Sequence, residues 1–163
     1  MKIPLTLNGK RTVLDADPSE PLSTVLRNEA LFSVKCGCTK GFCGNCMVLL
    51  DGAPVSSCIL PAGMVREATV TTLEYFKNDP LYTDIMNGFS KAGIQMCGYC
   101  NAGKIFTAYR ALSSPYRPDV RRLSEAVEPL SCCCTDRDTL VNGILYAMAA
   151  KQAREGRKGN VKK

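Results

Sequence analysis

Cysteine is the residue that most constrains what this chain can fold into. Ten of its 163 residues are Cys, and it contains no His. A metal site in such a chain must be built from thiolates or carboxylates, because the imidazole ligands of many metalloproteins are absent. General acid–base or nucleophilic catalysis by His is excluded as well. We expect a protein that binds metal or transfers electrons and has no catalytic residues of its own.

The sequence gives no sign of secretion or of membrane insertion. No stretch reaches the ~18 uninterrupted apolar residues of a membrane-spanning helix. Met1-Lys2-Ile3-Pro4 begins a strand-like pattern rather than a signal peptide. We therefore expect a cytoplasmic protein with no membrane partner. In a reducing compartment thiols seldom form lasting disulfides, and clustered Cys residues more often bind metal or perform redox chemistry.

The first half of the chain has the pattern of a small α+β domain. Alternating apolar residues on both sides of Asn8-Gly9 predict a strand hairpin. Apolar residues at helical spacing predict one short helix over residues 22–30. A second hairpin is predicted around Asp51-Gly52, and a strand over residues 69–72 completes the domain.

After Asn78-Asp79-Pro80 the apolar periodicity becomes helical. Four short helices are predicted from the apolar stripes of residues 81–89, 105–112, 120–127 and 140–148. We therefore expect three parts, which are an α+β domain over residues 1–77, a helical domain over residues 78–155 and a basic tail over residues 156–163.

The net charge of +6 arises largely at the C-terminal end. Glu155 is the only acidic residue among the six basic ones Lys151, Arg154, Arg157, Lys158, Lys162 and Lys163. We expect a solvated helix end that frays into the tail, and the alternative is a phosphate-binding patch or a docking arm for a partner. No aromatic stacking platform is interleaved with these residues, so we expect no nucleic-acid partner.

The first cysteine cluster has the spacing of a plant-type [2Fe–2S] site. The motif C-x₄-C-x₂-C and the hairpin after it supply four thiols, Cys38, Cys43, Cys46 and Cys58. Gly37, Gly41 and Gly44 allow the sharp turns that bring backbone N–H groups up to the sulfides. We predict that the four thiols bind one [2Fe–2S] cluster. Cys36 would break the spacing, so we expect an inert thiol there.

Two further cysteine clusters lie in loops between the predicted helices. They are Cys97-Gly98-Tyr99-Cys100 and Cys132-Cys133-Cys134. Two thiolate pairs could converge here on a metal. Cys132 and Cys134 are favoured over Cys133, because alternate side chains of a C-x-C segment point the same way. A structural zinc site with four Cys ligands is the alternative to an iron–sulfur cluster, since C-x₂-C pairs often bind zinc.

In both halves these residues resemble the small iron–sulfur subunit of the molybdenum hydroxylases, the group of xanthine dehydrogenase, carbon monoxide dehydrogenase and aldehyde oxidoreductase. In the first half the resemblance covers residues 35–46, Val48-Leu49-Leu50-Asp51-Gly52, Val55 and Ser57-Cys58. In the second half it covers residues 97–100, Gly103 and Cys132-Cys133-Cys134-Thr135. It therefore extends over almost the whole chain apart from the tail.

The resemblance implies a β-grasp ferredoxin-like domain followed by a four-helix domain, each with one [2Fe–2S] cluster. It implies that the first cluster is ligated by Cys38, Cys43, Cys46 and Cys58, and the second by Cys97, Cys100, Cys132 and Cys134. It also favours iron over zinc at the second site. In this family, electrons pass from molybdopterin in a large subunit through the helical-domain cluster and the ferredoxin-like cluster to FAD in a medium subunit. The chain would thus be the electron-transfer subunit of an oxidoreductase complex.

Some residues near the second cluster depart from the family pattern. Met96 stands where the family has a Gln that contacts the pterin, with Gln95 one place earlier, and Cys133 stands where Arg is usual. A neutral thiol in place of a guanidinium predicts a lower reduction potential for that cluster. Two alternative functions are a free-standing two-cluster carrier, against which the basic net charge counts, and a zinc-stabilised binding module. The substrate contacts of a complex would lie in another chain.

Overall fold

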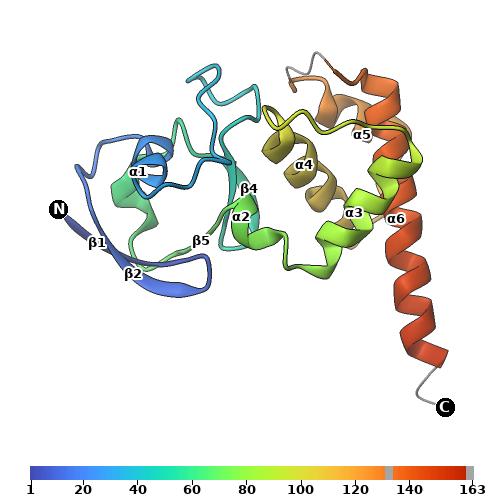
Figure 1. Ribbon diagram of the computed structural model, residues 1–163, viewed down its shortest axis with the longest axis horizontal. Coiled ribbons are helices and arrows are strands. Elements are labelled where there is room, and N and C mark those ends of the chain that lie inside the picture. Colours follow the sequence, from blue (N-terminus) through green and yellow to red (C-terminus); the bar gives the residue numbers. More distant parts are fainter. Residues whose placement is uncertain (131–133, 161–163) are drawn as a thin grey trace.

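The computed structural model describes the backbone of residues 1–130 and 134–160 and the side chains of residues 1–130 and 134–157. Within these ranges the chain forms two units side by side, a β-sheet with one helix at the N-terminal end and a group of helices at the C-terminal end (Figure 1). The chain is therefore α+β, as the sequence predicted.

The first unit is built on one mixed sheet of five strands in the order β2-β1-β5-β3-β4. The strands are β1 (Lys2–Leu7), β2 (Lys10–Asp15), β3 (Met47–Leu50), β4 (Ala53–Ser56) and β5 (Thr69–Thr71). Strands β1 and β5 are parallel, and the other neighbouring pairs are antiparallel. Helix α1 (Leu22–Asn28) lies in the connection between the two hairpins.

Both hairpins turn at the dipeptides that the sequence indicated. The φ angles are 51° and 77° at Asn8-Gly9 and 48° and 81° at Asp51-Gly52. Positive φ at both central residues is the geometry of the two-residue turn that matches the twist of the flanking strands. Because strand side chains alternate, Ile3 and Leu5 of β1 fall on one face and join the apolar side of α1 in the first core.

The second unit contains the four predicted helices and one short helix that the sequence did not indicate. The predicted helices are α3 (Pro80–Lys91), α4 (Asn101–Ser113), α5 (Val120–Val127) and α6 (Arg137–Asn160). The additional helix is α2 (Leu73–Phe76), and the first unit contains another unpredicted element, the 3₁₀ helix η1 (Ala62–Val65). Asp79 and Asp119 begin α3 and α5, because their carboxylates accept hydrogen bonds from N–H groups that lack a partner within the helix.

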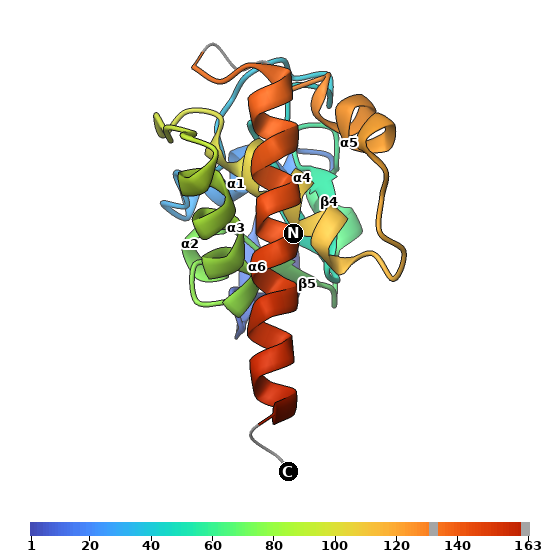
Figure 2. The same ribbon diagram turned by 90° about the vertical axis from the view of Figure 1, so that its right-hand side faces the viewer.

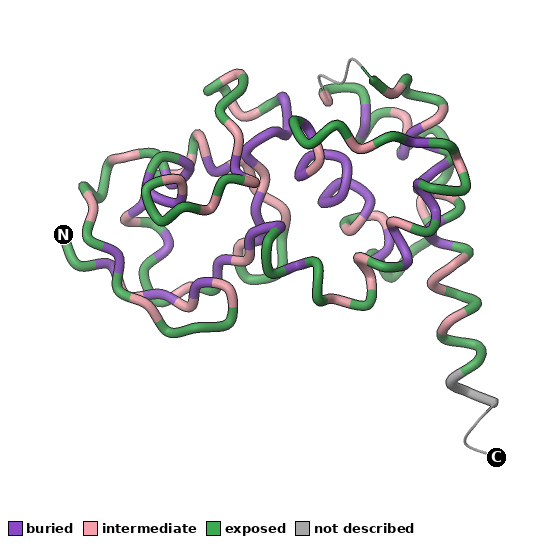
Figure 3. Tube along the Cα trace, viewed as in Figure 1, coloured by how far each residue is buried: buried purple, intermediate pink, exposed green. Residues whose placement is uncertain are grey.

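Helix α4 occupies the centre of the molecule. It packs against β3, α3, α5 and α6, and every residue from 102 to 108 is buried (Figure 3). Leu49 of β3 belongs to the same apolar core as Phe106 of α4. The two units therefore share a packed junction, and the start of α4 is held close to the loops of the sheet unit.

Helix α6 runs along α3, α4 and α5 (Figure 2). It comes very close to α3 at Gly88, where an added Cβ would lie 2.3 Å from the backbone nitrogen of Ala147. The Arg154 guanidinium of α6 makes two hydrogen bonds, of 2.9 and 2.7 Å, to Oδ2 of the buried Asp84 of α3. The C-terminal end of α6 extends past the other helices (Figure 2). The helix continues to Asn160, although we expected a tail from residue 156.

None of the helices in the described ranges is both long and apolar enough to span a membrane.

Candidate metal centres

The loop between α1 and β3 carries three of the four thiols predicted for the first site. Cys43 and Cys46 are buried, Cys38 is half-buried, and Cys58, just after β4, is also half-buried. Positive φ angles at Gly41 (84°) and Gly44 (78°) allow the backbone to turn back on itself. The Ser56 hydroxyl donates a 2.8 Å hydrogen bond to the carbonyl of Gly41 and fixes the loop to the hairpin.

Backbone N–H groups of this loop point at the sulfur atoms. Cys43 Sγ accepts from the N–H of Cys38, Cys38 Sγ accepts from the N–H groups of Lys40 and Cys43, and Cys46 Sγ accepts from the N–H of Cys58, each at 3.4 Å. Such donors stabilise negative charge on sulfur. The loop therefore favours thiolates, which are the form that ligates iron.

The electrostatics of the first site suit a bound metal cation. Burial raises the pKa of the Cys38 thiol, but hydrogen bonds from the backbone N–H groups of Cys43 and Lys40 outweigh it and lower that pKa to about 6. Burial raises the pKa of the Cys58 thiol to about 12, and the neighbouring Cys46 thiol adds to the increase. Crowded thiolates repel one another, and iron between them would remove that repulsion.

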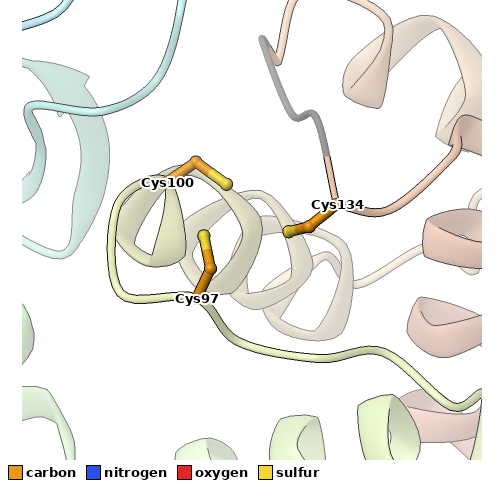
Figure 4. Close-up of side chains that lie close together, drawn as sticks. All are labelled: Cys97, Cys100 and Cys134. Carbon is orange, nitrogen blue, oxygen red and sulfur yellow. The ribbon is translucent and has the colours of Figure 1, made fainter.

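The second predicted site gathers thiols from two separate loops (Figure 4). The Sγ atoms of Cys97, Cys100 and Cys134 all lie within 4.8 Å of one another. Cys100 is buried at the N-cap of α4, whereas Cys97 and Cys134 are exposed. The N-terminal end of α4 is the positive end of its dipole, which favours a thiolate at Cys100. The predicted fourth ligand, Cys132, and its neighbour Cys133 lie outside the described residues.

The two sites are brought together by a contact between glycines. A Cβ on Gly103 of α4 would lie 3.0 Å from the carbonyl oxygen of Gly44, and a Cβ on Gly44 would lie 3.1 Å from Cα of Gly103. Gly44 follows Cys43 directly, and Gly103 lies in the helical turn that Cys100 begins. The Tyr99 hydroxyl adds a 3.3 Å hydrogen bond to the carbonyl of Cys36. The backbone of the first cysteine loop therefore lies against the first turn of α4, with the Leu130 side chain packed at both glycines.

Sequence reasoning missed one charged residue of the second site. Lys104 of α4 is fully buried, and its Nζ lies 3.3 Å from Cys134 Sγ. In the sequence it stands among apolar residues of a predicted helix, and only its charge at an apolar position could have drawn attention to it. Cys36 is exposed, and its predicted inertness stays a prediction.

Both halves of the chain match models of iron–sulfur families. Residues 5–72 match the 2Fe-2S iron-sulfur cluster binding domain, and residues 72–145 match the [2Fe-2S] binding domain. A nicotinate dehydrogenase small FeS subunit of Eubacterium barkeri is 35% identical over 147 residues, which are 90% of this chain and 94% of that subunit. The chain belongs to the small iron–sulfur subunits of the molybdenum hydroxylases. It is an electron-transfer subunit of an oxidoreductase with two [2Fe–2S] domains, and this overturns the zinc alternative for the second site.

Other relatives are either separate small chains or part of a longer chain. The xanthine dehydrogenase iron-sulfur-binding subunit of Escherichia coli O157:H7 is 34% identical, with 88% of this chain and 91% of that one aligned. The structure of quinoline 2-oxidoreductase from Pseudomonas putida 86 superposes with a TM-score of 0.79 at 30% identity and covers 93% of this chain and 96% of the matched chain. In the aldehyde oxidoreductase of Desulfovibrio desulfuricans ATCC 27774, the match has a TM-score of 0.81 at 32% identity and covers 93% of this chain but 17% of the longer one. Such subunits work in complexes with larger partners.

Proposed function

We propose that this subunit carries electrons from a molybdopterin centre in a large subunit to FAD in a medium subunit. The helical-domain cluster would lie on the molybdopterin side and the ferredoxin-like cluster on the FAD side. The ligands would be Cys97, Cys100, Cys132 and Cys134 for the first of these and Cys38, Cys43, Cys46 and Cys58 for the second. We assign residues 1–77 to a β-grasp domain, residues 78–155 to a four-helix domain and the complex to the cytoplasm.

The observation that carries this proposal is the contact between Gly44 and Gly103. Cys43 and Cys100, the buried thiols beside these glycines, are 4% exposed each. Because neither glycine has a side chain, the backbone of the first cysteine loop lies against the first turn of α4, and the Leu130 side chain packs at both glycines. A chain that holds two redox groups this close together, with their inner ligands shielded from water, is suited to pass electrons between them.

The residues of the chain bind and tune the clusters. Each bound cluster supplies a one-electron redox couple. The N–H groups of Lys40, Cys43 and Cys58 stabilise the sulfur charge at the first site, and the N-terminal end of α4 does so at the second. No proton transfer by the chain is required, which agrees with the absence of His.

The substrate of the complex would be an N-heterocycle or an aldehyde, oxidised at molybdenum in the large subunit. The names of the relatives include nicotinate, xanthine, quinoline and aldehyde. Substrate contacts would lie in the large subunit, so the residues of this chain would not determine which of these compounds is oxidised.

The metal content of the complex, purified from its native host without oxygen, tests the proposal. We expect about four iron and four sulfide per copy of this chain, as two [2Fe–2S] clusters require, with molybdenum and flavin in larger chains that co-purify. About two iron and one zinc per chain would contradict the second cluster. Clusters without any larger molybdenum- or flavin-containing chain would indicate a free-standing carrier instead.

Single cysteine variants test the assignment of the ligands. Cys43→Ala should remove one of two reduced EPR signals, and Cys100→Ala should remove the other. Cys36→Ala is the matched control, because Cys36 is exposed in the same loop as Cys43 and is not assigned to a cluster. It should leave both signals and the iron content unchanged. Loss of iron in Cys36→Ala would mean that the ligands of the first site are wrongly assigned.

A further inference from the structure

Lys104 is an unusual residue for the interior of a small domain. Its whole side chain is 0% exposed, in a run of buried residues on α4. A lysine normally keeps its ammonium group in water, and burial of that charge is costly unless an opposite charge or strong acceptor lies beside it. An acceptor or an opposite charge is therefore expected beside Nζ of Lys104.

The contacts of the ammonium group point to the sulfur site. Lys104 Nζ lies 3.3 Å from Cys134 Sγ and 3.1 Å from the hydroxyl oxygen of Thr135. Lys104 also lies one helical turn after Cys100, and its N–H donates to the carbonyl of Cys100 at 3.3 Å. A single turn of α4 thus supplies one thiol of the site and a cation that reaches a second thiol from another loop.

We propose that Lys104 is a positioning and charge-compensating residue that raises the reduction potential of the helical-domain cluster. This inference rests on the proposed assignment of Cys134 as a ligand. A [2Fe–2S] cluster with four thiolates carries net negative charge, and reduction adds one electron without making or breaking a bond. A buried ammonium at hydrogen-bond distance from a ligand sulfur stabilises the reduced form more than the oxidised form, because charges interact strongly in a medium of low dielectric constant. The electron would come from the molybdenum side of the complex.

The two sites differ in the kind of donor that reaches sulfur. At the ferredoxin-like site the described donors to sulfur are the neutral backbone N–H groups of Cys38, Lys40, Cys43 and Cys58. At the helical site a charged side chain donates to Cys134. Loss of the Lys104 charge should therefore change one potential and leave the other as it is, so that the ferredoxin-like cluster serves as an internal reference.

The test is an EPR-monitored redox titration of the purified complex carrying Lys104→Met, which keeps the length and apolar stem of the side chain. We expect the equilibrium constant for reduction of the helical-domain cluster to fall at least tenfold, which corresponds to a potential lower by 59 mV for one electron. Lys104→Arg keeps the charge and should retain most of the wild-type potential. Lys77→Met is the matched control, because Lys77 is an exposed lysine after α2, and it should shift neither potential.

Three outcomes would overturn the inference. The first is a shift in Lys104→Met no larger than that in Lys77→Met, and the second is an equal shift in Lys104→Arg. The third is loss of the cluster in both Lys104→Met and Lys104→Gln but not in Lys104→Arg, which would replace the tuning role by a role in assembly. If only Lys104→Met loses the cluster, Lys104→Gln takes its place in the titration. Failure of the ligand assignment is distinguishable, because Cys134→Ala would then keep the second EPR signal, whereas failure of the proposed second cluster would leave the wild-type complex without that signal.

Discussion

Replacement of Gly88 by Ala places a methyl group at the crossing of α3 and α6. The added Cβ would lie 2.3 Å from the backbone nitrogen of Ala147 and 2.5 Å from the carbonyl oxygen of Gly143. Non-bonded heavy atoms pack at about 3.5 to 4.0 Å, so the two helices must separate by roughly 1 Å. Neither partner can rotate away, because both atoms belong to the backbone of a helix.

Two effects of opposite sign decide the stability of Gly88→Ala. Alanine is favoured over glycine within a helix by about 1 kcal/mol. Overpacking typically costs about 1 to 3 kcal/mol, and a contact with rigid backbone belongs at the upper end of that range. The clash therefore wins, and the net loss of about 2 kcal/mol should lower the unfolding temperature by about 4 to 8 °C for a chain of this size.

Gly88→Ala should also disturb the geometry of the second metal site. Cys97 lies in the loop after α3, and Cys134 lies just before α6. Separation of these helices would move the two Sγ atoms apart, whereas the ferredoxin-like site is held by the sheet unit. We expect the EPR signal of the helical-domain cluster to be lost at a lower temperature than that of the ferredoxin-like cluster.

The assay is thermal unfolding of the purified complex, with the two cluster signals followed by EPR on samples that are reduced and frozen after each heating step. Gly156→Ala is the control, because Gly156 lies in α6 and a Cβ there would meet nothing within 4 Å. That variant should gain helix stability, up to about 1 kcal/mol, and unfold at a higher temperature. If Gly88→Ala is as stable as Gly156→Ala, the close crossing of α3 and α6 does not exist.

Two further predictions concern single polar contacts. Arg154→Met should lower the unfolding temperature, since it removes the charged partner of the buried Asp84 carboxylate. The double variant with Asp84→Asn should recover part of the lost stability, and no recovery would contradict this explanation. Burial raises the pKa of Glu74, but hydrogen bonds from Ser33 and Thr72 outweigh it and hold that pKa below its usual value of 4.5. A depressed pKa adds stability above pH 4.5 that is lost as the pH falls through the folded-state pKa, so unfolding temperatures of wild type and Glu74→Gln should converge in acid. A constant difference between them from pH 3 to pH 7 would refute the linkage to Glu74.

The sequence by itself determined the features that depend on neighbouring residues. The spacing of Cys38, Cys43 and Cys46 with interleaved glycines indicated a [2Fe–2S] loop, because such a loop must turn sharply around the cluster. Asn8-Gly9 and Asp51-Gly52 indicated the hairpins, since these dipeptides accept positive φ. Apolar stripes gave the four main helices, but the extension of α6 to Asn160 was missed, because polar residues there lack a stripe and the Asp84–Arg154 pair joins distant positions.

The tertiary structure alone decided which distant residues meet. Cys97 and Cys100 reach Cys134 only because α3, α4 and α6 pack together, and nothing in local periodicity specifies that convergence. The contact of Gly44 with Gly103 and the burial of Lys104 against Cys134 have the same origin. Close packing lets two backbones touch where side chains are absent, and it removes water from a charge so that the nearest sulfur must stabilise it.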